Sequence, residues 1–597
     1  MNMAENKSLT DRFVDSLFSK DKTLLYLIIL AALGLVLRII AAINLGVFAD
    51  DMHFAPGAIN FLSSGKLEYW DQSAGLWFAV TDIFYKILGA TQLASRFSAV
   101  LFGTMLIFAT FLLAKEFFKD NKTALIASLL VAVSPFHIKS MMAEMDVMAM
   151  FFSVFSFYFF IKATNKNYEK KLLVLSGILL GLAIYTKVYP LLFIPGMLIF
   201  FFYKNYKENK FPVSKALKLA FLFLVVVFVF CMPVLTHNYL LYKSKGIVDD
   251  KFARFFGIEK SKEIYSWAAG SDKLDLSAFF FGKQGAYNGW PLSLQVLRWV
   301  FNADPIIFIL GVIGALLLWK HKELLFLLLL LFLPPYIYLG SAVWLIKHFL
   351  FISILMTFPA AFTLNLISNK IRFVRLRYIA IVIILFSVIY IGYLNQANFS
   401  VYEKSAVSKL MDYKQNMDPD SLVVVDSRVY RGQMTWIFSD RHYLEASYLN
   451  QLFASQQNKT GILTTVYFIE CAKDDCGWGT VYNQPEFNAS MEDVVSYFKN
   501  ISMKQATISE KTGEYFTVYK TTLNLAPEAL ALADSTHNWW LYPLGYNRQI
   551  SAIFDDYSPK SFFDVLLNNC ARFILYFSVF SAFASILILV YYLINST

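Results

Sequence analysis

The chain has 597 residues, of which 57% are hydrophobic and 16% are charged, against about 25% charged residues in an ordinary soluble domain. This composition excludes a wholly soluble protein, because long stretches within residues 24–394 carry almost no charge while residues 396–569 have a soluble composition. The formal net charge of +10 does not indicate nucleic-acid binding, since the Lys and Arg residues lie in short loops between apolar segments, where membrane topology accounts for them.

About twelve apolar segments are candidate transmembrane helices, since a bilayer core is spanned by roughly 20 apolar residues. They cover residues 24–44, 94–115, 123–139, 147–161, 172–186, 188–203, 217–235, 305–319, 324–339, 344–366, 379–394 and 570–594. The segments at 147–161 and 172–186 are short, so a neighbouring pair is also compatible with a re-entrant hairpin. The pattern predicts an α-helical polytopic membrane protein.

The distribution of Lys and Arg predicts the orientation. An N-terminal arm, residues 1–22, carries four basic residues and one apolar helical face, which is typical of an amphipathic helix on the inner surface. The loops on the same predicted side are basic in five cases: 115–122, 162–171, 204–215, 320–322 and 370–377. Because basic loops stay cytoplasmic, we expect both termini inside and residues 45–93, 236–303 and 396–569 outside.

Four units follow from this pattern: the arm at 1–22, a membrane region at 23–395, an outer domain at 396–569 and a last transmembrane helix at 570–597. In the outer domain, strand patterns at 422–426 and 462–469 and helical patterns at 405–415 and 491–499 predict a small α/β or α+β fold. No phosphate-binding loop or metal-ligand spacing is recognisable there.

Two features of the outer domain suit an external compartment. Cys471 and Cys476 are able to form a disulfide outside the cell, although a free pair fits the sequence equally well. Four short sequons would suit a glycosylated surface; they begin at Asn398, Asn458, Asn488 and Asn500.

Several ionisable residues lie in or beside the apolar segments, where burying a charge is costly, so each is a candidate functional group. Arg38 lies about two turns inside the first segment, and we weigh a functional or ion-paired role against simple snorkelling. Asp50 and Asp51 follow at the outer end, with His53 close by. This acidic pair either caps the next helix or carries chemistry, and we favour chemistry.

Further acids and bases fall at the same predicted depth on the outer side. As single residues they are also explained as hydrated interfacial acids or as snorkelling anchors. Together they indicate a polar site that opens outward and holds an anion. They are Arg96, Glu144, Asp146, Lys187, Lys347 and His348, with Tyr185 beside Lys187.

Transfer of a sugar from a polyprenyl phosphate to a hydroxyl would use such a site. The acceptor needs a general base, for which Asp50 or Asp51 is suited. The leaving phosphate needs positive charge, for which Arg96, Lys187 and Lys347 are suited. A single base implies attack from the face opposite the phosphate, and therefore inversion.

Residues 48–54, Phe-Ala-Asp-Asp-Met-His-Phe, resemble the first-loop motif of the protein O-mannosyltransferases, in which Asp-Glu is followed by a hydrophobic residue, His and Phe. The plan of residues 24–395 also resembles the wider GT-C superfamily, which includes the lipid A aminoarabinose transferases. In that plan Arg96 matches the Arg that opens the second span, and Asp146 the acid near the start of the fourth. The resemblance implies that Asp50 is the base, that Asp51 is its neighbour and that no divalent metal or other cofactor is needed.

The resemblance also implies the partners: a polyprenyl-phosphate sugar donor in the bilayer, and a protein, glycan or glycolipid acceptor. The sugar is mannose, another hexose or a modified pentose. The chain departs from the mannosyltransferases in having Asp51 for Glu and in lacking His-Pro-Pro-Leu near residues 69–77. It departs from the oligosaccharyltransferases at residues 539–543, Trp-Trp-Leu-Tyr-Pro, where those enzymes have Trp-Trp-Asp-Tyr-Gly.

The main alternative is a multi-pass transporter or a flippase for lipid-linked sugars. Transporters place their ionisable groups near the midplane, between internal repeats. Here the groups gather at one surface and no repeat is recognisable, so we favour the enzyme. The composition suggests a prokaryotic cell membrane, and an archaeal one is compatible with it.

Overall fold

The computed structural model describes residues 22–370 except 48, 70–71, 257, 259–274, 283–289 and 343–345, and residues 404–596 except 430–433, 435, 455–460, 473–475, 477–484, 511–512 and 528–558. Between these parts it describes 382–383, 386–387 and 390, and at some helical positions, Asp50 among them, only the backbone. The predicted N-terminal arm, most of the 379–394 segment, the 539–543 motif and the sequons at Asn398 and Asn458 lie outside the described residues.

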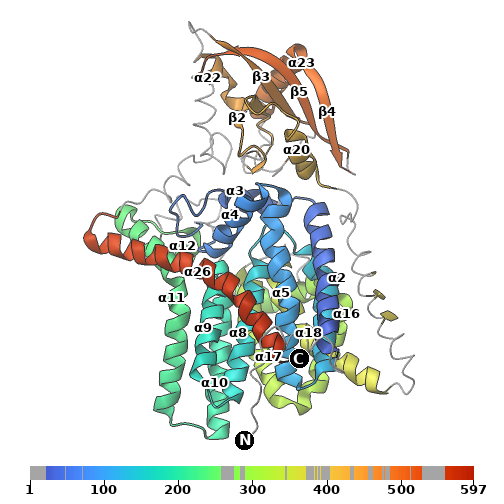
Figure 1. The fold of residues 1–597 in the computed structure, drawn as a ribbon, viewed down its shortest axis with the longest axis vertical. Coiled ribbons are helices and arrows are strands. Elements are labelled where there is room, and N and C mark those ends of the chain that lie inside the picture. Colours follow the sequence, from blue (N-terminus) through green and yellow to red (C-terminus); the bar gives the residue numbers. More distant parts are fainter. Residues whose placement is uncertain are drawn as a thin grey trace, which may run out of the picture.

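A bundle of helices forms the larger part of the molecule (Figure 1). Its long members are α2 (Thr23–Asn44), α5 (Gln92–Phe118), α6 (Asn121–Val133), α8 (Asp146–Asn165), α9 (Lys170–Thr186), α10 (Phe193–Glu208), α11 (Val213–Lys245), α16 (Pro305–Leu317), α17 (Lys322–Ala342), α18 (Leu350–Lys370) and α26 (Phe562–Ile594). Each predicted apolar segment within the described residues is helical, which confirms the polytopic helical fold.

Fewer helices than predicted are long enough to cross a bilayer unaided. Among the described residues, 7 helices are long and apolar enough to cross a membrane. The number is 8 if α15 (Leu292–Ala303) and α16, which are bent by 119° relative to each other, count as one span. Helices α9 and α10 have 17 and 16 residues, about 26 and 24 Å at 1.5 Å per residue, whereas the bilayer core is roughly 30 Å thick. Helix α6 stops at Val133 because Pro135 follows, and α7 (Pro135–Lys139) begins a new direction.

Glycines allow neighbouring helices of the bundle to approach closely. A Cβ atom at Gly181 of α9 would lie 2.8 Å from Cβ of Phe230 in α11, and one at Gly314 of α16 would meet the Pro359 carbonyl of α18. Without a hydrophobic driving force between helices in lipid, such close backbone contact supplies much of the packing energy.

Short helices cover one end of the bundle. Helices α3 (Ala49–Gly57) and α4 (Leu76–Leu88) lie between the bundle and the sheet domain, and α12 (Asp250–Phe256) lies beside them (Figure 1). The aromatic side chains of α4 and of the loop before it are packed inward: Tyr69 and Phe78 stack with their ring centroids 4.3 Å apart, and Trp77 is fully buried. These contacts fix α3 and α4 on top of the bundle. A short helix α14 (Leu276–Phe281) completes this set.

The outer domain is a five-stranded mixed sheet with strand order β2-β1-β3-β5-β4. Strands β1 (Leu422–Val425), β2 (His442–Glu445) and β3 (Ile462–Cys471) are parallel, while β4 (Met503–Glu510) and β5 (Gly513–Leu525) add antiparallel pairs. Helices α20 (Ala406–Lys414), α22 (Leu449–Ala454) and α23 (Pro485–Ile501) accompany it. The two predicted strands and two predicted helices are confirmed.

One side-chain link closes a loop within the outer domain, and another joins this domain to the helix bundle. Cys471 and Cys476 form a disulfide, which settles the alternative that the sequence left open. The Ser405 hydroxyl donates to the Gln92 amide oxygen at 2.5 Å, and Gln92 in turn donates to three carbonyls at the end of α2. The start of the outer domain is therefore attached to the outer end of the first two long helices.

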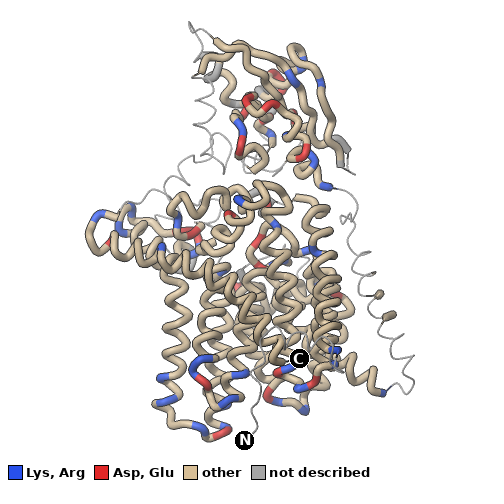
Figure 2. Tube along the Cα trace, viewed as in Figure 1, with Lys and Arg blue, Asp and Glu red and all other residues tan. Residues whose placement is uncertain are grey.

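Charged residues are distributed unevenly along the bundle. Figure 2 shows Lys and Arg gathered at the end opposite the sheet domain, with few charges along the middle of the helices. The basic loops of the sequence analysis therefore lie at one end. That this end is cytoplasmic remains a prediction from the charge bias.

Candidate functional site

The acidic pair lies on α3, which begins directly after the end of α2. Asp51 is fully buried and forms a two-point ion pair with Arg96 of α5: Nη2 donates to Oδ2 at 2.9 Å and Nε to Oδ1 at 3.3 Å. The Ala143 amide donates to the same Oδ1 at 2.5 Å. Asp50 is the second residue of α3, and its side chain lies outside the described set.

Arg96 holds the outer end of α2 as well as Asp51. Nη1 donates to the carbonyls of Ala42 and Leu45 at 3.0 and 2.9 Å, and Nη2 donates to that of Gly46 at 2.9 Å. These carbonyls lie at the C-terminus of α2, where backbone acceptors lack helical partners. A guanidinium has five N–H donors, so this arrangement leaves none for a phosphate. Phosphate binding by Arg96 stays a prediction, while the structure gives it a positioning role.

Two further ion pairs lie beside the acidic pair. Asp146, at the first position of α8, accepts from Nζ of Lys187 at 2.6 Å, and its other oxygen lies 3.6 Å from Nδ1 of His348. Glu144 accepts from Nζ of Lys347 at 3.0 Å. The structure thus brings together residues that lie far apart in the sequence.

Electrostatics links the three pairs into one group, which we call the outer ion cluster: Asp51, Arg96, Glu144, Asp146, Lys187, Lys347 and His348. Burial and then the charge of Asp146 raise the pKa of Glu144 well above its usual value, and Asp51 adds to this rise while Lys187 and Arg96 oppose it. Carboxyl groups with pKa values raised by burial and neighbouring charges concentrate at functional sites.

The cluster also touches the acidic helix through Lys347. Its ammonium lies 5.9 Å from the centroid of the Phe54 ring in α3, within the range of a cation–π contact. His53 is buried and lies 3.4 Å from the Tyr69 hydroxyl through Nε2. Residues 49–54 therefore contact the cluster through Asp51 and Phe54, and they contact Tyr69, in the loop between α3 and α4, through His53.

Two of the predicted site residues have structural partners. Arg38 is fully buried in α2 and donates to the carbonyls of Gly34, Val131 and Ala132, so it binds the C-terminus of α6, where a cation is favourable. The Tyr185 hydroxyl donates to the Leu67 carbonyl at 2.7 Å. These contacts fix helices and the first outer loop.

Sequence reasoning missed two groups of buried acids. Asp304, at the bend between α15 and α16, accepts from the hydroxyls of Ser134 and Ser353 at 2.7 and 2.5 Å and so ties α7 and α18 to the bend. An acid directly before Pro305 and an apolar segment was the available signal.

The second missed group joins the two outer loops. Asn238 donates to Asp249 at 2.6 Å and to Glu68 at 3.4 Å, and Ser73 donates to Asp249 at 2.8 Å. Burial and the nearby Asp249 carboxylate raise the pKa of Glu68 well above its usual value, and burial also raises that of Asp249. Glu68 lies within an aromatic stretch and Asp249 just beyond an apolar helix, so hydropathy alone gave no signal for their pairing.

The described part of the chain shows no recognisable metal site. No group of three or more His, Cys, Asp or Glu side chains is arranged there to hold an ion. The positive charge near the acidic pair comes instead from Arg96, Lys187 and Lys347.

Known proteins resemble the chain in one segment and in the fold. Residues 74–237 match the family described as dolichyl-phosphate-mannose-protein mannosyltransferase. This segment runs from just before α4 into α11 and contains Arg96, Glu144, Asp146 and Lys187. No curated protein sequence matches the chain.

Solved structures extend the likeness over most of the chain. ArnT from Cupriavidus metallidurans bound to undecaprenyl phosphate superposes with a TM-score of 0.51 and 12% identity, over 83% of this chain and 97% of that one. Its apo state gives 0.50 and 11%, with the same coverage. The apo oligosaccharyltransferase of Archaeoglobus fulgidus gives 0.49 and 16%, over 91% and 87%. Residues 74–237 therefore resemble that mannosyltransferase family, and the described chain shares the fold of ArnT, which agrees with the GT-C-like fold predicted from the sequence.

Proposed function

We propose that the protein is an inverting glycosyltransferase that moves a sugar from a polyprenyl-phosphate donor to a hydroxyl on the outer side of the membrane. The observation that carries the proposal is the outer ion cluster, which gathers acids and bases at the end of the bundle beneath the sheet domain. The lipid tail would remain between the helices while the phosphate reaches these cations. The sugar is mannose, another hexose or a modified pentose, and the acceptor is a protein, a glycan or a glycolipid.

Lys187 and Lys347 are the proposed phosphate ligands. Each ammonium has three donors. Lys187 has one described carboxylate partner, Asp146, and so keeps donors for a phosphate oxygen, while Lys347, which pairs with Glu144, adds positive charge beside it. Lys187 and His348 both contact Asp146, so the charge of a bound phosphate would act on His348 as well. As the bond between the anomeric carbon and the phosphate oxygen breaks, the electron pair stays on the phosphate, and the ammonium groups stabilise the growing negative charge.

Asp50 is the proposed base. Both oxygens of its neighbour Asp51 are committed to Arg96 and to the Ala143 amide, so Asp51 is suited to holding α3 in place. Asp50 would take the proton of the acceptor hydroxyl while the hydroxyl oxygen attacks the anomeric carbon from the face opposite the phosphate. We propose that no divalent metal takes part, because the cluster supplies the positive charge.

The decisive experiment uses purified full-length protein and a panel of polyprenyl-phosphate sugars, with release of polyprenyl phosphate as the readout. Asp50→Asn should lower turnover by about 100-fold or more while the protein still inserts and folds. Asp420→Asn, at an exposed position of the outer domain, is the matched control and should leave turnover unchanged. Wild-type turnover by Asp50→Asn would remove the proposed base, and lipid flux in vesicles without product would favour a transporter.

A further inference from the structure

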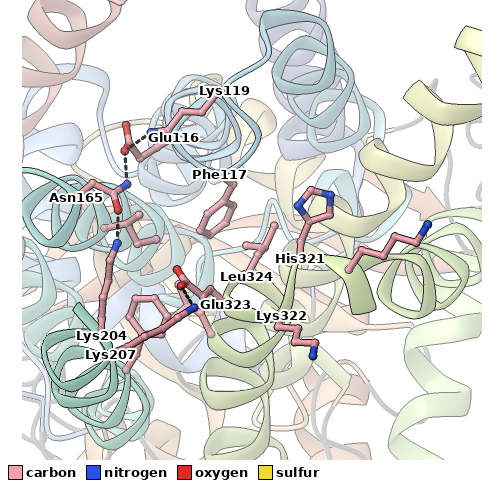
Figure 3. Close-up of a pocket in the computed structure, with 14 residues that line it drawn as sticks. Glu116, Phe117, Lys119, Asn165, Lys204, Lys207, His321, Lys322, Glu323 and Leu324 are labelled. Carbon is pink, nitrogen blue, oxygen red and sulfur yellow. Dashed lines mark hydrogen bonds and ion pairs between the residues drawn. The ribbon is translucent and has the colours of Figure 1, made fainter. Parts of the chain in front are cut away.

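A second site lies at the end of the bundle opposite the outer ion cluster. A cavity of about 520 Å³ opens there between the ends of α5, α8 and α10 and the start of α17 (Figure 3). Its lining includes two glutamates, one histidine and five lysines. We call it the basic pocket, and its lysines are Lys119, Lys204, Lys207, Lys320 and Lys322.

Carboxylates neutralise only part of this charge. Lys119 pairs with Glu116 and Lys207 with Glu323, each at 2.5 Å. These two pairs account for both glutamates of the lining, so three lysines remain in excess within the pocket.

Lys204 is the residue that most clearly indicates a ligand. Its side chain is only 7% exposed, and its ammonium donates to the amide oxygen of Asn165 (Figure 3). Its described carboxylate partner, Glu208, forms a long ion pair with it at 3.9 Å and also pairs with Lys210, so Glu208 compensates the Lys204 charge only in part. Burying an ammonium is costly unless an opposite charge compensates it, and an anion in the pocket would provide that compensation.

The pocket combines this charge with an apolar lining. Phe117, Phe200 and Leu324 line it beside the lysines, so a ligand that carries both a phosphate and a hydrocarbon part would match both surfaces. Basic pockets between transmembrane helices on the cytoplasmic side are sites for anionic lipid headgroups, and the charge bias predicts that this end faces the cytoplasm.

We propose that the basic pocket binds a phosphate group, held by Lys204 and Lys207, and that an anionic phospholipid supplies it from the inner leaflet. The proposal does not depend on the transferase activity, because the pocket lies at the other end of the bundle. Free phosphate shares this chemistry, so the experiment separates the two sources.

The test measures lipid binding to the full chain in neutral detergent by native mass spectrometry. Phosphatidylglycerol should bind more tightly than phosphatidylcholine of the same chain length. The double variant Lys204→Met/Lys207→Met should weaken phosphatidylglycerol binding roughly 30-fold, at about fivefold for each lysine. The control Lys171→Met/Lys218→Met removes two exposed lysines outside the pocket and should change it little.

A second variant guards against misfolding. Lys207→Gln removes one charge from a side chain that is 51% exposed, and it should weaken phosphatidylglycerol binding about fivefold while the melting temperature stays near that of the wild type. In a separate arm, inorganic phosphate at constant ionic strength should give little thermal stabilisation. Strong stabilisation by phosphate without preference for the anionic lipid would overturn the lipid assignment. Equal lipid binding by wild type, pocket variants and control would overturn the site itself.

Discussion

Replacing Arg96 by Met tests whether its guanidinium joins α5 to Asp51 of α3 and to the carbonyls at the end of α2. The change would leave the Asp51 carboxylate buried without its cation, which costs about 3–5 kcal/mol. It would also leave the Gly46 carbonyl without its described donor, at about 1 kcal/mol or more, whereas the Ala42 and Leu45 carbonyls keep the Gln92 amide as a donor. The sum, about 4 kcal/mol or more, is a large share of the whole stability of many domains, about 5–15 kcal/mol. We therefore expect Arg96→Met to lower the apparent melting temperature severely.

A comparison of variants separates the ion pair from the carbonyl contacts. Arg96→Met/Asp51→Asn removes the uncompensated charge and should recover about 3 kcal/mol of the loss. Arg38→Met is the matched control, because Arg38 is equally buried and its described hydrogen bonds all go to carbonyls; adding Asp51→Asn to it should give no recovery. Thermal unfolding of the purified chains measures each difference. The reasoning fails if Arg96→Met melts like the wild type, or if Asp51→Asn does not rescue it.

Other predictions address the donor, the loops and the metal. Lys187→Ala should raise the KM for the donor about tenfold, whereas Lys187→Arg retains the charge and should recover most of the affinity; unchanged KM in the Ala variant would leave Lys187 as a partner of Asp146 only. Because the pKa of Glu68 is raised in the folded state, its contribution to stability is present at acidic pH and lost as pH rises. Glu68→Gln, which resembles the protonated acid, should therefore flatten the decline of melting temperature as pH rises above the ordinary glutamate pKa of 4.5, and a decline as steep as in the wild type would contradict this. Turnover should survive excess EDTA, and full inactivation that Mg²⁺ or Mn²⁺ reverses would refute the metal-free mechanism.

Hydropathy predicted which segments form helices, and local chemistry set where they end. The 123–139 segment is divided because Pro135 ends α6 and starts α7. The 217–235 segment is part of a 33-residue helix, α11, which carries His237 and Asn238 into what the sequence assigned to an outer loop. Polar side chains on the buried face of a helix lower its hydropathy without ending it, so a window average stops too early.

The sequence identified the residues of the outer ion cluster but not how they pair. Depth and sidedness identified Asp51, Arg96, Glu144 and Lys187 as one group, because all of them border apolar segments on the same predicted side. The sequence could not show that Arg96 would use all its donors within the protein, since that depends on where the last carbonyls of α2 lie in space.

The contact between Arg96 and α2 has a consequence for membrane thickness. Helix α2 has 22 residues, about 33 Å at 1.5 Å per residue, and Arg96 fastens α3 to its outer end. The height of the acidic pair above the opposite leaflet is therefore set by the length of one helix. One residue inserted into α2 would move its last carbonyls by about 1.5 Å and turn them by roughly 100°, away from the guanidinium. In the proposed reaction, the length of helix α2 would thus set the depth of Asp50 relative to the depth at which the bilayer presents the donor phosphate.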